Sequence, residues 1–120
     1  MSATTVNFLS VKNNVDFYRT LTIKSKVGEA APVAIDLTSA TIFMQIKPAL
    51  GGAAVVSLSV GDGITKTDPT NGKISILIDS EEMKTIEPGK YIYDLVIVRS
   101  GLSEIVMQGY MKIKSGATAI

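Results

Sequence analysis

The sequence predicts an all-β fold, an antiparallel β-sandwich of six or seven strands with one short helix. Segments in which apolar side chains alternate with others recur along the chain and are rich in β-branched residues. Turn-forming residues separate these segments about every 8–12 residues, which is the spacing typical of a sandwich. The 120 residues, 46% of them apolar and 19% charged, suffice for a single domain, residues 1–120, with its own core.

The N-terminal segment predicts the first strand. In residues 4–12, Val6 and Phe8 alternate with polar neighbours, although the apolar residues that follow fall out of this alternation. The two ends of the chain have no composition that would order them on their own. We therefore expect residues 1–14 and 115–120 to form extended arms of the domain.

Four further segments have the alternation of half-buried strands, and they are residues 16–24, 40–47, 54–60 and 72–79. One face of these strands carries Phe17, Arg19, Leu21, Ile23, Ile42, Met44, Ile46, Val56, Leu58, Val60, Ile74, Ile76 and Ile78. The residues between the segments, at 25–32, 48–52 and the pair Asn71-Gly72, have the composition of turns.

Residues 79–89, DSEEMKTIEPG, are the one stretch with helical character. Asp79 or Ser80 can cap the first turn, and the two glutamates that follow favour the N-terminal end of a helix. The Pro-Gly pair at residues 88–89 ends it. We expect one or two helical turns that join two strands.

The last two predicted strands, residues 89–99 and 104–114, are joined by a turn at residues 99–101 as an antiparallel hairpin. The second of them is expected to turn Ile105, Met107, Met111 and Ile113 inward. The first, GKYIYDLVIVR, is apolar on both faces. If Tyr91, Tyr93, Leu95 and Ile97 fill the core, the outer face carries Ile92, Val96 and Val98 beside Asp94.

Outer faces of a free antiparallel sandwich are usually polar, so these outward apolar residues need a partner. One interpretation is a protein interface, because contiguous apolar patches commonly mark such interfaces. The candidate interface residues are Phe43, Ile92, Val96, Val98, Val106 and Tyr110. The alternative is that the short helix and the N-terminal segment of the same chain cover part of this face.

The composition argues against catalysis. The chain has no cysteine and no histidine, which removes thiolate chemistry, the commonest general base and the commonest transition-metal ligand. It also lacks a nucleophile elbow, a P-loop and a dinucleotide-binding motif. We therefore expect a protein that is not an enzyme, with no cofactor and no catalytic or metal site.

Two acidic groups have simpler explanations than chemistry. Asp62, Asp68 and Asn71 do not have the spacing of a calcium loop and are typical turn residues. The three glutamates between residues 81 and 87 fit a helix start and a solvated surface better than a catalytic carboxylate pair.

Charge and hydropathy argue against nucleic-acid and membrane partners. Twelve basic and 11 acidic residues give a net charge of +1, without the basic excess that nucleic-acid binding usually requires. Lys112 and Lys114 on one strand face are explained as protection of a sheet edge. We expect no secretory signal, and the longest uncharged stretch, residues 48–61, is too short to span a bilayer.

Several segments, taken in order, resemble a known family. They are DFYRTLTIK, IDLTSATIFMQIKP, GITKTDPTNGKISILIDSEEM, EPGKYIYDLVIV and MQGYMKIKSG. The matching motifs are Asp36-Leu37-Thr38, Pro88-Gly89, and Tyr91, Tyr93, Asp94 and Leu95. This set resembles the small immunoglobulin-like β-sandwich domains of bacteriophage tail and baseplate structural proteins, such as the N-terminal domain of baseplate upper proteins. The resemblance covers about residues 15 to 115.

The resemblance implies a non-enzymatic virion structural protein, a component of the tail, baseplate or neck. Such a protein is made in the host cytoplasm and assembles in the virion with other structural proteins, as a homo-oligomer or in many copies. Two alternatives stay open. One is a head decoration protein, and the other is a carbohydrate- or receptor-binding module of a host-attachment appendage, for which Tyr18 and Tyr110 are the outward aromatic side chains.

Overall fold

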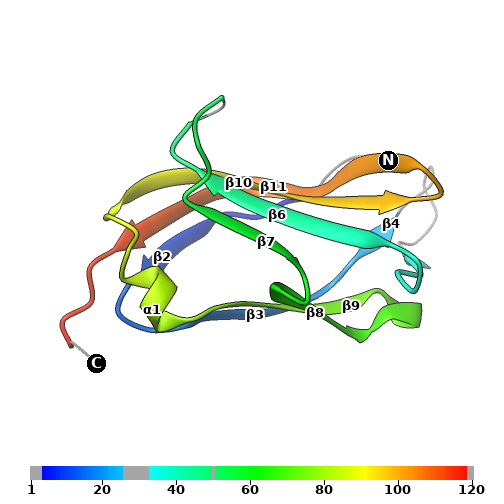
Figure 1. Ribbon diagram of the computed structural model, residues 1–120, viewed down its shortest axis with the longest axis horizontal. Helices are drawn as coiled ribbons and strands as arrows, with labels where there is room; N and C mark the ends of the chain where they lie inside the picture. Colours follow the sequence, from blue (N-terminus) through cyan, green and yellow to red (C-terminus); the bar gives the residue numbers. More distant parts are fainter. Residues whose placement is uncertain (1–3, 26–32, 50, 119–120) are drawn as a thin grey trace.

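The computed structural model describes residues 4–25, 33–49 and 51–118, and this part of the chain is mostly β-structure with very little helix (Figure 1). The all-β class is therefore confirmed. The strands are β1 (Thr4–Thr5), β2 (Phe8–Lys12), β3 (Phe17–Thr22), β4 (Lys24–Ser25), β5 (Val33–Ala34), β6 (Thr41–Lys47), β7 (Val56–Val60), β8 (Gly63–Asp68), β9 (Lys73–Ile78), β10 (Gly89–Arg99) and β11 (Leu102–Lys114). The helices are a 3-10 turn, η1 (Pro69–Asn71), and α1 (Ser80–Met83). Neither described helix is long enough to cross a lipid bilayer.

Most strands belong to one continuous sheet, in the order β1-β11-β10-β6-β7-β8-β9-β3, with β2 also paired to β11. The sheet curls into a nearly closed barrel, with β6, β10 and β11 in an upper layer and β3, β8 and β9 in a lower one (Figure 1). The expected sandwich of six or seven strands is not confirmed. The reason is a short parallel pairing of β7 with β8, Ser59 with Gly63 and Val60 with Ile64, which joins the two layers.

The core lies between the two layers and is built by the alternation that the sequence predicts. Its fully buried side chains come mainly from β6, β9 and β10, and they include Ile42, Met44, Ile46, Ile74, Ile76, Ile78, Leu95 and Ile97. At one end of the barrel, the buried side chains of Met83 and Ile86 belong to the same core. This helical segment therefore contributes to the interior and does not lie on the outer face of the upper layer (Figure 1).

Aromatic side chains fill the seam of the barrel between β2 and β3, which do not pair with each other in the described residues. The rings of Phe8 and Phe17 meet edge to face, with their centroids 5.3 Å apart. The guanidinium carbon of Arg19 lies 4.6 Å from the centroid of the Phe17 ring. Arg19, predicted on the same face as Phe17, is thus accommodated at this seam as a cation–π contact.

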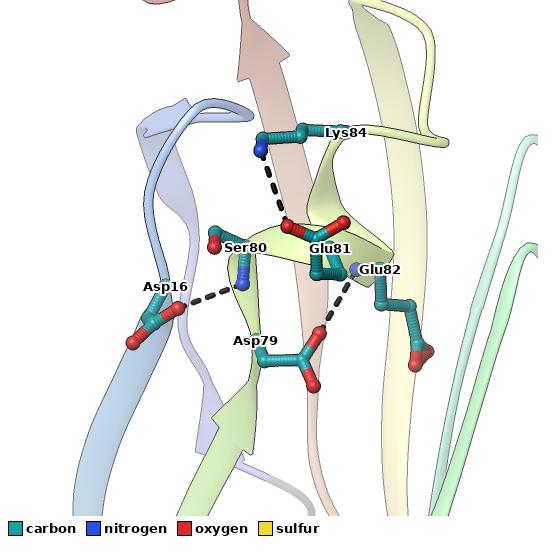
Figure 2. Close-up of polar contacts among 6 residues, drawn as sticks. All are labelled: Asp16, Asp79, Ser80, Glu81, Glu82 and Lys84. Carbon is teal, nitrogen blue, oxygen red and sulfur yellow. Dashed lines mark hydrogen bonds and ion pairs between the residues drawn. The ribbon is translucent and has the colours of Figure 1, made fainter. Parts of the chain in front are cut away.

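The helix α1 is capped as predicted (Figure 2). The carboxylate of Asp79 accepts a hydrogen bond from the backbone N–H of Glu82 at 2.9 Å. Asp16, from the turn before β3, accepts a second one from the N–H of Ser80 at 2.7 Å. Two carboxylates thus satisfy N–H groups that the first helical turn leaves unpaired. The α-helix ends at Met83, earlier than the expected stop at residues 88–89.

The connection from α1 to β10 is fixed by Tyr91. Its hydroxyl donates a hydrogen bond to the backbone carbonyl of Glu87, four residues upstream, at 2.6 Å. The ring itself is buried in the core. A tyrosine at the start of a strand that bonds back to the preceding connection is known as a tyrosine corner.

Much of the segment expected as an N-terminal arm belongs to the sheet. Strands β1 and β2 pair in parallel with β11 and are interrupted at residues 6–7, which accounts for the broken alternation in the sequence. The hydroxyl of the buried Tyr93 donates to the Val6 carbonyl at 2.5 Å. Gly109 allows this close approach, because a Cβ there would collide with the Val6 carbonyl oxygen. Residues 1–3 lie outside the described residues.

Two other short segments differ from the prediction. Residues 63–68 form strand β8, although the sequence predicts only turns there, because Ile64 is the single fully buried side chain in a polar strand. Strands β4 and β5 flank the expected turn at 25–32, of which residues 26–32 lie outside the described residues. The hairpin turn is confirmed: Ser100 and Gly101, both with positive φ (52° and 76°), connect β10 to β11.

Candidate interaction surface on the outer face of β6, β10 and β11

The register of the upper layer arranges its outward side chains in rows that cross the strands. In one row, Val96 of β10 lies between Phe43 of β6 and Ile105 of β11. Phe43 is 43% exposed and Ile105 41% exposed, while Val96 is half-buried between them. Val98 lies two residues further along β10 on the same face, next to this row, and is also half-buried. These four residues, Phe43, Val96, Val98 and Ile105, are called the apolar patch below.

A β-bulge in β11 corrects two of the predictions. Leu95 pairs with Met107, but the next residue, Val96, pairs with Ile105, so Val106 is an extra residue in β11. A bulge of this kind reverses the alternation of inward and outward side chains. Val106, predicted on the outer face and in the interface, is 6% exposed and belongs to the core. Ile105, predicted to point inward, belongs to the outer face instead.

A polar row separates the apolar patch from the other two predicted interface residues. Asp94 lies between Gln45 of β6 and Gln108 of β11, and the amide of Gln45 donates to the hydroxyl of Ser57 at 3.2 Å. Beyond this row, Ile92 is opposite Tyr110. The structure therefore brings Phe43, Val96 and Val98 together and buries Val106. Ile92 and Tyr110 form a separate pair on the other side of the polar row.

Neither the helix nor the described part of the N-terminal segment reaches the apolar patch. The helix α1 lies at the end of the barrel, with its buried side chain in the core (Figure 1). The N-terminal strand β1 runs along the far edge, where Thr5 is paired with Gln108 in the polar row. Within the described residues, Phe43 and Ile105 consequently remain open to solvent.

A groove lies over the polar row, whose three residues all line it, and has a volume of about 380 Å³. Its lining includes Asn7, Gln45, Lys47, Asp94 and Tyr110, so that three strands of the upper layer and the N-terminal segment all contribute. The side-chain oxygen of Asn7 accepts a hydrogen bond from the backbone N–H of Tyr110 at 2.9 Å and so fixes one wall. Amide, carboxylate and phenol groups in one groove are able to bind a polar ligand.

The two tyrosines considered for sugar stacking lie apart. Tyr110 is on the upper layer, and the ammonium nitrogen of Lys90 sits 4.0 Å from its ring centroid. Tyr18 is on β3 in the lower layer, paired with Leu77 of β9. They cannot form one stacking platform, and one face of the Tyr110 ring is already in contact with a lysine.

A second hollow, of about 750 Å³, lies beside the β10–β11 turn and includes Asp36, Arg99 and Glu104. Arg99 forms an ion pair with Glu104 at 3.3 Å. The Asp36 carboxylate accepts hydrogen bonds from the hydroxyl and the backbone N–H of Thr38, at 2.6 and 2.9 Å. These bonds, the hydroxyl first, hold the pKa of Asp36 below its usual value. The Asp36-Leu37-Thr38 motif therefore builds a turn.

The acidic groups of the sequence are placed in turns and in the helix. Asp68 accepts a hydrogen bond from the side chain of Asn71 at 2.9 Å within the turn that η1 forms. Glu81 forms an ion pair with Lys84 at 3.3 Å. The described residues contain no group of three or more acidic side chains arranged to hold a metal ion.

A comparison of the whole chain with known protein families finds no family model that matches it, and a comparison with characterised proteins finds no significant similarity.

Proposed function

We propose that this protein is a non-enzymatic structural component of a bacteriophage virion, in the tail, baseplate or neck, and that it assembles through protein–protein contacts. The observation that carries the proposal is the apolar patch, which leaves Phe43 and Ile105 exposed on an ordered β-layer. An apolar surface on a rigid sheet is suited to burial against another protein. The family resemblance of the sequence supplies the virion context.

We further propose that the fold is an immunoglobulin-like sandwich whose two layers are joined at one edge. The pairing separates into β3-β9-β8 and β2-β11-β10-β6-β7, which is the strand grouping of that fold. The tyrosine corner at Tyr91 supports the same proposal, because its hydrogen bond to Glu87 precedes the strand that corresponds to strand F. The two-residue β7–β8 pairing is then a local bridge between two sheets.

The direct test of the virion role is mass spectrometry of phage particles purified from the cells that encode the chain. We expect the protein as a stoichiometric component of intact particles. Its absence from particles that are complete in their other structural proteins would overturn the proposal.

The role of the apolar patch is tested with two matched variants. Phe43→Ser and Leu77→Ser replace side chains that are each 43% exposed, one on the upper and one on the lower layer. Because both are half exposed, each should cost no more than about 1 kcal/mol of folding stability. We expect only Phe43→Ser to reduce incorporation into particles. Equal incorporation of both variants would contradict the assignment of the interface to this face.

A second candidate function rests on the groove. Its polar lining and the Tyr110 ring are suited to a carbohydrate, as in a receptor-binding module of a host-attachment appendage. Glycan-array binding that is lost in both Asp94→Ala and Tyr110→Ala would support this function. Binding that survives both substitutions would exclude the groove as the site.

A further inference from the structure

Lysines gather at one end of the outer face, around the first residues of β10 and the last residues of β11. Lys90 lies directly opposite Lys112 in the β10–β11 ladder, and Lys114 is paired with Lys12 of β2. Lys47 ends the neighbouring strand β6, diagonally across from Lys90. These five residues are called the lysine surface below.

The lysine surface carries repulsion between like charges, and in the described part of the chain no carboxylate forms an ion pair with it, although the ammonium group of Lys90 contacts the Tyr110 ring. Like charges placed directly opposite each other on neighbouring strands are destabilising, and two such pairs occur here side by side. The two ion pairs of the described residues lie elsewhere and involve Lys84 and Arg99. A surface with this arrangement is suited to a negatively charged partner.

A surface of opposite charge lies at the same end of the molecule, on α1 and the turn before β3 (Figure 1). It consists of Asp16, Asp79, Glu81 and Glu82, all exposed, with Lys84 as the basic side chain among them (Figure 2). Asp16 and Asp79 are held in place by their hydrogen bonds to the start of the helix. These four acidic residues are called the acidic surface below.

We propose that the lysine surface binds the acidic surface of a second copy of this chain. Within one copy, the acidic surface belongs to α1 and the turn before β3, whereas the lysines belong to β6, β10, β11 and the paired strand β2. Each copy therefore offers both charges to its neighbours, either in a two-fold pair or in a repeating head-to-tail contact. The inference deepens the proposed function and rests on it, because it names a second copy as one partner in the assembly.

The first measurement is sedimentation equilibrium of the full chain at about 50 mM and about 500 mM salt. We expect self-association at low salt that weakens about tenfold or more at high salt, since exposed charge pairs are screened. A chain that stays at its monomer mass of 12.7 kDa at every concentration and salt level would overturn the proposal.

Charge reversal then tests the two surfaces separately. Lys90→Glu with Lys112→Glu, and Glu81→Lys with Glu82→Lys, should each weaken self-association about tenfold or more, because each removes most of the charge of its surface and places like charges against each other at the substituted positions. An equimolar mixture of the two double variants should restore association, because both contacts are again between opposite charges. Failure of the mixture to associate would overturn the pairing of these surfaces.

A matched control separates this contact from the effect of net charge. Lys24→Glu with Lys73→Glu changes the net charge by the same amount as the reversal on the lysine surface, but both residues lie outside it. We expect this control to self-associate like the wild type, because its lysine surface and its acidic surface are both intact. Thermal unfolding of every variant confirms that each one is folded. A control that behaves like the lysine-surface variant would contradict a specific contact.

The outcomes for this inference and for the virion role can be told apart. A protein that is present in particles but does not self-associate refutes the contact between copies alone. A protein that self-associates but is absent from particles refutes the virion role alone. Binding of a DNA oligonucleotide that depends on Lys90 and Lys112, by a chain that stays monomeric, would assign the lysine surface to a different partner and overturn the inference.

Discussion

Strands β10 and β11 are neighbours in the sheet, but they use their two faces differently. In β10, every second side chain from Tyr91 to Ile97 is buried, and those between are half-buried without interruption. In β11, the alternation breaks at the bulge, where Val106 and Met107 are both buried although they are adjacent. A single extra residue thus moves Ile105 to the outer face and gives the apolar patch its fourth member.

The difference shows how a sheet acquires an exposed apolar patch from a limited set of apolar residues. Strand β10 alternates regularly from Tyr91 to Ile97. Its inward side chains fill the core, and the outward side chains in this range are half-buried between those of the neighbouring strands. Strand β11 instead divides into two parts on either side of the bulge. The part near the β10–β11 turn faces Ile105 outward, and the part near the C-terminus faces Tyr110 outward. The polar row with Asp94 lies between these two places.

The largest effect should separate the two faces of β10. Leu95→Ala removes a fully buried side chain and should lower the free energy of unfolding by about 3 kcal/mol, because it leaves a cavity in the core. Val96→Ala, on the half-buried outer face, should cost about 1 kcal/mol. Chemical denaturation monitored by circular dichroism measures both values. Equal losses would mean that the outer face of β10 is as fully packed as the inner one.

The next effect tests the bulge in β11. Val106→Ser places a hydroxyl in the core and should cost about 2 kcal/mol, whereas Ile105→Ser, on the solvent side, should cost less than about 1 kcal/mol. The same denaturation measurement applies to both variants. A larger loss of stability in Ile105→Ser than in Val106→Ser would contradict the bulge. It would mean that Ile105 points inward, as the uninterrupted alternation in the sequence predicts.

These two strands also show why part of the fold was predictable and part was not. The inward row of β10, the Asp79 cap and the turn at residues 99–101 depend on residues close together in the chain, so their patterns are visible in the sequence. The bulge depends on the register between two strands, and a local pattern does not encode it. Strand β8 was missed because it buries only Ile64 fully, and the β7–β8 bridge was missed because two residues of parallel pairing leave no periodic signal.

The candidate surface likewise has a part that local sequence patterns predict and a part that depends on the register between strands. Phe43, Val96 and Val98 were predicted on the outer face because each alternates with buried neighbours on its own strand. The separation of Ile92 and Tyr110 from them depends on Gln45 and Gln108, which meet Asp94 only in the folded sheet. The lysine surface is of this kind too, because its cross-strand pairs join residues far apart in the sequence. The sequence placed only Lys112 and Lys114 together and explained them as protection of a sheet edge, which is wrong because β11 is paired on both sides.

The smallest effect concerns Tyr93, which lies opposite Gly109 and links β10 to the N-terminal segment. Tyr93→Phe should cost about 1 kcal/mol at neutral pH, because the Val6 carbonyl loses its hydrogen bond. Burial raises the pKa of Tyr93 to about 12 from its ordinary value of 10.0. Between pH 10 and 12 the unfolded chain therefore releases a proton that the folded chain retains.

Release of that proton favours the unfolded chain, so the stability of the wild type should fall by on the order of 1 kcal/mol per pH unit in this range. Tyr93→Phe lacks this contribution, and the other tyrosines titrate in both proteins. The difference between the two proteins should consequently shrink above pH 10 and reverse at about pH 11, which urea denaturation at a series of pH values measures. A constant difference from pH 8 to 12 would mean that Tyr93 ionises equally well in the folded protein, and that its link to the N-terminal segment is open to water.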